Sequence, residues 1–198
     1  TTNFNESGAF YYTNPEEPSP DIQLHFAFSM VDQHGLKKHG RGGFTCHICV
    51  LRPKSVGSVK LADANPNSPP LIDPAFLKDE RDLDTMLAGV KQAQQIMQAP
   101  SFDAHRGKAL YAGASNDDEE LKEDIRNRAD TIYHPVGTCK MGPDSDPNAV
   151  VDQRLRVRGI KSLRVIDASI MPKIVSGNTN APSIMIGEKG AHMILEDA

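Results

Sequence analysis

The stretch DIQLHFAFSM, residues 21–30, decides the fold of this chain. Its apolar residues alternate with more polar ones, and they are Ile22, Leu24, Phe26, Phe28 and Met30. Because successive side chains of a strand point to opposite faces, this spacing predicts a strand with one buried face. The stretch GFTCHICVL, residues 43–51, repeats the alternation. The polar, glycine-rich residues between the two stretches predict a long hairpin loop.

The segments that follow predict more strands and two helices. GSVKL at 57–61 and PPLID at 69–73 are typical of short strands separated by turns. Residues 79–98 place apolar side chains at helical spacing, namely Leu83, Met86, Leu87, Val90 and Met97. Residues 115–129 predict a second helix with Ser115 as its N-cap. Together these patterns predict an α+β fold, a mostly antiparallel sheet covered by helices.

The chain changes character after about residue 130, where glycine, proline and asparagine become frequent. Residues 163–166 predict a short buried strand, and residues 176–194 predict a loop that leads into a helix with Pro182 in its first turn. Gly187 and Gly190 predict close approach of another group to that helix. We therefore expect two domains, a body at 1–130 and a strand–loop–helix tail at 131–198. No G-x-G-x-x-G motif follows a strand.

Composition excludes several classes of function. The chain has 198 residues, 38% of them hydrophobic and 24% charged, with a formal net charge of −4. These values indicate a globular protein with a real core and no basic surface for nucleic acid. Its apolar runs are too short for a transmembrane segment. The first residues lack the pattern of a secretory signal, so we expect a cytoplasmic location, with the periphery of the inner membrane as an alternative.

The three cysteines predict neither a disulfide scaffold nor a metal site. Cys46 and Cys49 form a C-x-x-C pair, but the alternating pattern around them sends the two thiols to opposite faces of a strand. No second pair completes a zinc site, so we expect no metal. The small, odd number of cysteines fits a reducing compartment.

One histidine stands in an unusual loop, YHPVGTCKMG at 133–142. Such a histidine either hydrogen-bonds its own loop or serves as a placed proton acceptor. Asn178 has two interpretations as well, because asparagine favours helix N-caps and can also hydrogen-bond a substrate oxygen. Asn180, nearer to Pro182, is the better candidate for a helix cap. Asp167, at the end of the expected strand, is typical of a turn residue.

Three motifs in the tail, taken together and in order, resemble a known family. YHPVGTCKMG (133–142), VVDQRLRVRGIKSLRVIDASIMP (150–172) and SGNTNAPSIMIGEKGAHMI (176–194) are similar to the C-terminal signatures of glucose–methanol–choline (GMC) flavin oxidoreductases. The choline dehydrogenase-like and alcohol dehydrogenase-like branch is the most similar. Upstream, NFNESGAF (3–10), PDIQLHFAF (20–28) and LRPKSVGSVKL (51–61) resemble segments of that branch's substrate domain.

The resemblance implies a domain organisation. Residues 1–130 would be the substrate-binding domain, and 131–198 a C-terminal segment that carries the catalytic motif and belongs to the FAD-binding lobe. Members of the family begin with a dinucleotide-binding segment that carries G-x-G-x-x-G. We therefore expect a C-terminal fragment, inactive by itself, whose partners are a small-molecule alcohol and the missing N-terminal FAD-binding region. FAD would then be bound in the full-length parent and absent from the fragment.

The resemblance also implies residue roles. His134 would be the base that accepts the hydroxyl proton, and Asn178 would hold the alcohol oxygen. The positions that would approach the flavin, largely through backbone groups, are Asp167, Ala168, Asn178, Thr179 and Asn180. The implied activity is oxidation of a primary, choline-like alcohol to an aldehyde, with hydride transfer to FAD. The alternative is a non-catalytic substrate-binding module, or a subunit that needs a separate flavin-binding chain.

Overall fold

The computed structural model describes residues 5–40 and 42–197. Asn3 and Phe4, which begin one of the resembling segments, lie outside these described residues. The chain divides into two compact units. The first comprises the described residues up to Val56 together with Ala75–Asp130, and the second comprises Gly57–Pro74 and the residues from Thr131 onward. Each unit is described by itself.

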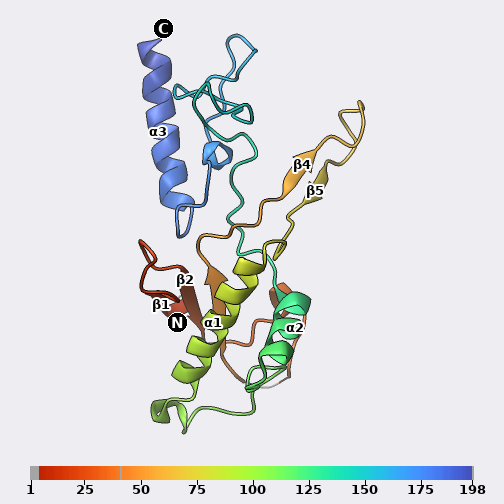
Figure 1. Cartoon of the computed structure of the whole chain (residues 1–198), viewed down its shortest axis with the longest axis vertical. Helices are drawn as coiled ribbons and strands as arrows, with labels where there is room; N and C mark the ends of the chain where they lie inside the picture. The colour runs from red at the N-terminus through yellow and green to blue at the C-terminus, as the bar shows by residue number, and fades with distance from the viewer. Residues whose placement is uncertain (1–4, 41, 198) are drawn as a thin grey trace. The chain divides into compact units, whose positions relative to one another are not determined.

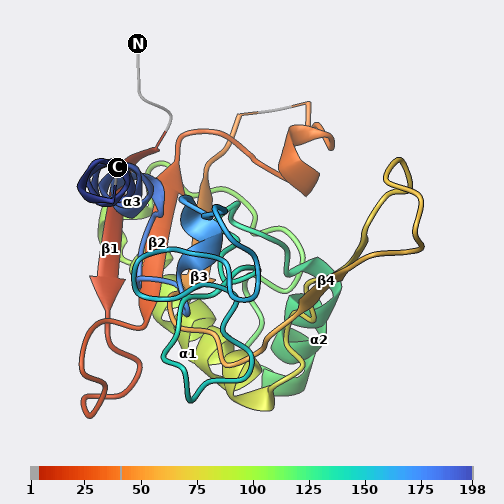
Figure 2. The same ribbon diagram turned by 90° about the horizontal axis from the view of Figure 1, so that it is seen from above.

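The first unit is built on a three-stranded antiparallel sheet (Figure 2). Its strands are β1 (Asn5–Tyr11), β2 (Ile22–Ala27) and β3 (Thr45–Val50), in the order β1-β2-β3. Leu24 pairs with Ile48 and His25 with His47, so the alternating residues of β2 and β3 share faces as the sequence predicts. Strand β1 was not predicted, since its burial pattern shows mostly exposed residues and its sequence little alternation.

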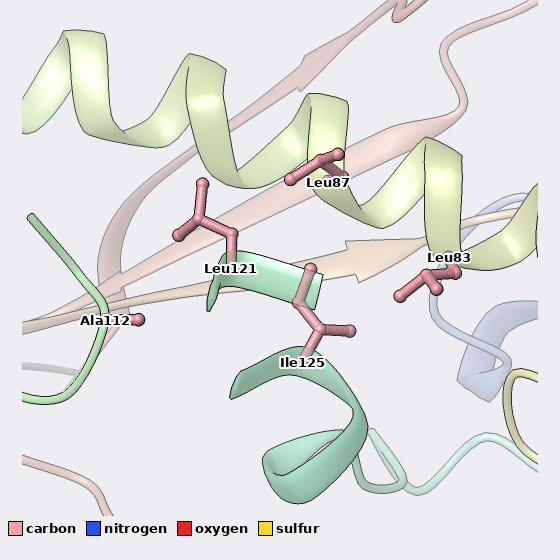
Figure 3. Packing of buried hydrophobic residues seen from close by; sticks show 5 residues of the cluster. All are labelled: Leu83, Leu87, Ala112, Leu121 and Ile125. Atoms are coloured by element: carbon pink, nitrogen blue, oxygen red, sulfur yellow. The ribbon is translucent and has the colours of Figure 1, made fainter. Parts of the chain in front are cut away.

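Helix α1 (Glu80–Met97) packs against this sheet on one side and against helix α2 (Asp118–Arg128) on another (Figure 1). Ile22, Leu24 and Ala93 form the buried cluster between sheet and helix. A second cluster joins the two helices (Figure 3), and its buried members are Leu83, Leu87, Ala112, Leu121 and Ile125. The helical face predicted around Leu83 and Leu87 is therefore confirmed.

The two helices of the first unit are capped by aspartates. Asp79 accepts a hydrogen bond from the Arg81 N–H at the start of α1. At the start of α2 the cap is Asp117, whose side chain accepts from the N–H groups of Glu119 and Glu120. The prediction of Ser115 as this cap is wrong. Its hydroxyl instead bonds the Glu120 carboxylate, because the carboxylate of Asp117 stands nearer to the free N–H groups.

The second unit contains the remaining two strands, β4 (Ser58–Lys60) and β5 (Leu71–Asp73). Both strands were predicted, and they pair antiparallel with one another. They form a two-stranded sheet of their own, with all their residues exposed, and do not extend the three-stranded sheet. The turn-rich connection between them, residues 61–70, returns the chain so that the two strands hydrogen-bond to each other.

The strand predicted at 163–166 does not form. Only an isolated bridge between Arg156 and Arg164 lies there, and Leu163 is 45% exposed. A strand needs a continuous neighbouring backbone to pair with, and within the described part of the chain residues 163–166 have a single isolated bridge. The core is instead made by loops and one helix, with Val151, Leu155, Ile170, Met171 and Ile186 as its buried residues.

Helix α3 (Asn180–Glu196) completes the second unit and begins as predicted, with Pro182 in its first turn. A Cβ on Gly190 would lie 2.3 Å from Ile166 Cγ2, so the predicted close approach is confirmed there. At Gly187 a Cβ would meet nothing within 4 Å, so none of the described residues approaches the helix there. Gly187 lies on the exposed side of the helix, whereas Gly190 faces the core.

The architecture confirms the α+β class, with antiparallel strands and a sheet that a helix covers. No helix in the described part of the chain combines the length and the apolarity that crossing a bilayer requires.

Candidate active site

His134 lies on a loop of the second unit. The course of this loop is set by two backbone turns and a main-chain hydrogen bond. Tyr133 has a φ of +65° and Gly137 a φ of +89°, so the chain turns sharply on either side of the histidine. Further along, the Cys139 N–H donates to the Ser169 carbonyl at 3.0 Å. These features fix where the loop runs, and they leave the half-buried imidazole of His134 beside the N-terminus of α3.

The imidazole meets two consecutive residues at the start of α3. Asn178 Nδ2 lies 2.7 Å from His134 Nε2. On the other side of the ring, Thr179 Oγ1 lies 2.9 Å from Nδ1, and the Thr179 main-chain nitrogen lies 3.4 Å from the same atom. The structure thus brings together His134 and Asn178, which are 44 residues apart in the chain.

Asp167 and Ala168 lie at the start of a short 3-10 helix, η3 (Ala168–Ile170). The Asp167 carboxylate is exposed and accepts a hydrogen bond from the Ser169 N–H at 2.8 Å. It therefore has the local turn role that its sequence position suggests. Ala168 is half-buried and packs against the core of the second unit.

The N-terminus of α3 carries no negative charge of its own. Thr179 is its N-cap but makes no side-chain cap hydrogen bond, and the first turn holds no acidic residue. Asn180 is the exposed first helical residue, so its prediction as the cap is wrong by one position. Free N–H groups and the helix dipole give this end partial positive charge.

The arrangement is suited to proton transfer. Among the described residues, the hydrogen-bonding partners of His134 are uncharged, namely the side chains of Asn178 and Thr179 and the main-chain N–H of Thr179. A histidine in this setting can accept a proton from a hydroxyl group, and an amide beside it can hold the oxygen. The side chain of Thr179 was missed by sequence reasoning, because no spacing pattern signals a contact between residues 45 apart.

The C-x-x-C pair and the other histidines do not form a second site of this kind. Cys46 faces the sheet–helix core, whereas Cys49 Sγ lies on the opposite face, 3.7 Å from His25 Nε2. Burial raises the pKa of each thiol to about 11, and both cysteines are free. No group of three or more potential metal ligands occurs among residues 5–40 and 42–197.

Comparison with known proteins defines the class. The family model described as GMC oxidoreductase matches residues 53–187, and the chain belongs to this family. This confirms the resemblance inferred from the tail motifs.

Within this family, the chain is similar to curated alcohol and choline dehydrogenases. The chain is 50% identical to the alcohol dehydrogenase [acceptor] of Pseudomonas putida, over 98% of this chain and 35% of that protein. It is 45% identical to the mitochondrial choline dehydrogenase of Homo sapiens, over 96% of this chain and 32% of that protein. The chain thus spans about a third of the length of these curated relatives.

Solved structures share the fold. Pyridoxine 4-oxidase from Mesorbium loti superposes with a TM-score of 0.86 at 28% identity, covering 96% of this chain and 37% of that one. An FAD-dependent oxidoreductase from Chaetomium thermophilum gives a TM-score of 0.77 at 26% identity, covering 92% of this chain and 29% of that one.

Proposed function

We propose that this chain is the C-terminal, catalytic part of an FAD-dependent dehydrogenase that oxidises a primary, choline-like alcohol to an aldehyde. The observation that carries the proposal is the contact of His134 Nε2 with Asn178 Nδ2 at 2.7 Å. This pair stands within the residues that match the GMC oxidoreductase model. The named alcohol and choline dehydrogenases, which align with nearly all of this chain, support the substrate class.

His134 is the proton acceptor in this proposal. The hydroxyl proton of the alcohol passes to Nε2 of the neutral imidazole, which becomes an imidazolium. Asn178 donates from its amide to the same oxygen, where negative charge develops as the proton leaves. The two nitrogens are 2.7 Å apart, so a hydroxyl oxygen that approaches from the side can lie within hydrogen-bonding distance of both.

The residues at the start of α3 and η3 fit an FAD. When bound, FAD supplies the acceptor for the hydride that leaves the carbinol carbon. Its ring would be held by Asp167, Ala168, Asn178, Thr179 and Asn180. The open N-terminus of α3, without acidic residues in its first turn, suits a group that gains negative charge on reduction.

The domain roles belong to the same proposal. Residues 1–130 bind the substrate, and residues 131–198 supply the catalytic histidine and the flavin contacts. Binding of the ADP half requires a dinucleotide-binding region in addition, because the chain contains no G-x-G-x-x-G after a strand. Exposed apolar side chains on the outer face of α3, such as Ile184 (61%) and Leu195 (76%), support a covering region there.

The alternative of a non-catalytic binding module is not favoured, since the named relatives are enzymes that align with 96–98% of this chain. A cytoplasmic location, or one at the periphery of the inner membrane, stays a prediction.

Anaerobic stopped-flow mixing of the FAD-loaded enzyme that contains this chain with primary alcohols, choline included, tests the proposal. We expect rapid flavin reduction and formation of the aldehyde. The substitution His134→Ala should slow reduction by roughly a hundredfold or more. His192→Ala is the matched control, because His192 is 61% exposed and pairs with Glu196 on the far end of α3. Near-normal reduction in His134→Ala would remove the proposed role.

A further inference from the structure

The side chain of Thr179 is the second partner of His134, and the family resemblance gives this residue only a flavin contact through its backbone. Thr179 is 8% exposed. Its hydroxyl lies 2.9 Å from His134 Nδ1 and makes no cap hydrogen bond to α3, although Thr179 occupies the N-cap position. Threonine at an N-cap ordinarily bonds the helix backbone. Here the hydroxyl serves the histidine instead.

A neutral imidazole carries one proton, so one ring nitrogen donates and the other accepts. With the proton on Nδ1, the ring donates to Thr179 Oγ1 at 2.9 Å and accepts from Asn178 Nδ2 at 2.7 Å. With the proton on Nε2, Nδ1 accepts from the Thr179 hydroxyl and from its main-chain N–H at 3.4 Å. In that arrangement the Nε2–H would point at Asn178 Nδ2 at 2.7 Å, and an amide nitrogen cannot accept a hydrogen bond.

The amide nitrogen of Asn178 favours the proton on Nδ1. The 2.9 Å contact between Nδ1 and Thr179 Oγ1 suits either arrangement, because a hydroxyl can accept or donate. The contact that distinguishes them is the 2.7 Å contact with Asn178 Nδ2, since an amide nitrogen only donates and Nε2 must then accept. Nδ1 therefore carries the proton and donates it to Thr179 Oγ1, and the main-chain N–H of Thr179 stands farther away, at 3.4 Å.

We infer that Thr179 is a positioning residue that holds the resting proton of His134 on Nδ1 and thereby keeps the lone pair on Nε2, where the alcohol hydroxyl can replace Asn178 as the donor. The inference rests on the proposed function of His134. When the alcohol hydroxyl gives its proton to Nε2, the Nδ1–H continues to donate to Thr179 Oγ1, and no bond to Thr179 is made or broken. A carboxylate fills the orienting position in serine-protease triads, whereas this hydroxyl orients the ring without adding negative charge.

The tautomer can be measured directly by NMR on the ¹⁵N-labelled chain, without FAD or substrate, at a pH where the imidazole is neutral. The ring nitrogens of His134 are assigned as the signals that His134→Gln removes from the set of seven histidines. We expect Nδ1 to carry the proton and Nε2 to show the shift of an unprotonated nitrogen. A population mainly protonated on Nε2 would overturn the inference.

Two substitutions sharpen the test. Thr179→Val keeps the shape and removes the hydroxyl, so that the main-chain N–H is left as the donor facing Nδ1. We expect the proton to move to Nε2 in this variant and to stay on Nδ1 in Thr179→Ser. The valine variant loses no capping hydrogen bond, because the Thr179 hydroxyl makes no hydrogen bond to the backbone of α3 as a cap. An unchanged tautomer in Thr179→Val contradicts the inference, and if that variant does not fold, the wild-type and serine spectra still decide it.

Kinetics of the FAD-loaded enzyme add a second readout. Thr179→Val should lower kcat by roughly tenfold to a hundredfold with little change in KM, and Thr179→Ser should restore most of the rate. Equal kcat in wild type and Thr179→Val would refute the positioning role. The two proposals fail separately, because normal flavin reduction in His134→Ala removes the catalytic role of His134 and leaves the measured tautomer unaffected.

Discussion

At the scale of single residues, we expect alanine substitutions at the two glycines of α3 to change the unfolding free energy in opposite directions. Gly190→Ala places a Cβ 2.3 Å from Ile166 Cγ2, a branched and partly buried side chain that has little room to move. We expect this variant to lose about 1–3 kcal/mol of unfolding free energy. Gly187→Ala meets nothing within 4 Å and should gain up to about 1 kcal/mol from helix propensity.

Guanidinium unfolding of both variants and the wild type measures this difference. Equal stability of the Gly190→Ala and Gly187→Ala variants would show that α3 does not lie against Ile166 as described.

The candidate site shows what sequence can predict at this scale. His134 and Asn178 were selected by resemblance to family motifs, since a loop histidine or an asparagine before a helix has more than one interpretation by itself. Their contact joins residues 44 apart, and no periodicity reports such a contact. The Thr179 hydroxyl was not foreseen as a partner of His134, because its position predicts helix capping.

At the scale of elements, Asp82 ties α1 to the chain that follows β3. Its carboxylate is 4% exposed and accepts the Lys54 N–H at 2.7 Å and the Ser55 N–H at 2.8 Å. Asp82→Ala leaves two backbone donors without a partner and should cost about 2–4 kcal/mol of unfolding free energy. The control is Asp84→Ala, whose side chain is 68% exposed and lies 3.8 Å from Lys122.

Denaturant unfolding compares the two variants. A loss in Asp82→Ala no larger than that in Asp84→Ala would rule out this tie between the elements.

A second buried carboxylate, Asp32, anchors the loop between β2 and β3. It is 8% exposed and accepts hydrogen bonds from the Tyr111 hydroxyl and from His39 Nε2, the latter at 2.9 Å. Lys37 and Arg128 stand farther away, at 3.7 and 3.9 Å. The Tyr111 hydrogen bond is the largest of the causes that hold the pKa of Asp32 below its ordinary value of 3.8.

The lowered pKa of Asp32 gives a pH dependence with a defined sign. The stabilisation is fully present above pH 3.8 and is lost as the pH falls through the lower pKa of the folded state. Tyr111→Phe should therefore destabilise the protein by about 1–2 kcal/mol at neutral pH, and the difference from wild type should shrink in acid. Tyr12→Phe, on a side chain 50% exposed, is the control. A difference that is independent of pH down to pH 2 would exclude this linkage.

The elements were predictable where one buried face imposes a period. Alternation predicted β2 and β3, and helical spacing predicted the face of α1 that carries Leu83. Strand β1 was not predicted, because its residues are mostly exposed and its sequence therefore shows no alternation of apolar and polar residues. The strand expected at 163–166 failed for the opposite reason, since an apolar run does not report whether a neighbouring backbone is present to pair with it.

At the scale of the whole molecule, the chain divides differently in space than along the sequence. The segment Gly57–Pro74 belongs to the same unit as the residues from Thr131 onward. The composition of the sequence does not change at residues 57–74, because this segment has turns and short strands like those around it. Its membership in the second unit was therefore not predictable. The family, by contrast, was predictable from the tail motifs and is confirmed by the match over residues 53–187.

Flavin binding is also a property of the whole molecule. We expect the purified 198-residue chain to show no flavin absorption band after FAD is added and excess is removed, because no G-x-G-x-x-G segment is present for the ADP half. An absorbance spectrum together with a fluorescence titration checks this. A stable band would mean that the residues around the N-terminus of α3 hold the ring without that segment.

The measurement that tests the central claim most directly is the pH dependence of flavin reduction by a primary alcohol, compared between the FAD-loaded enzyme and its His134→Gln variant. If His134 accepts the hydroxyl proton, the wild-type rate rises with pH in a single step, because only the neutral imidazole can act as the base. In His134→Gln that step should disappear, and the rate should fall by roughly a hundredfold or more. A variant that keeps both the step and the rate would contradict the account.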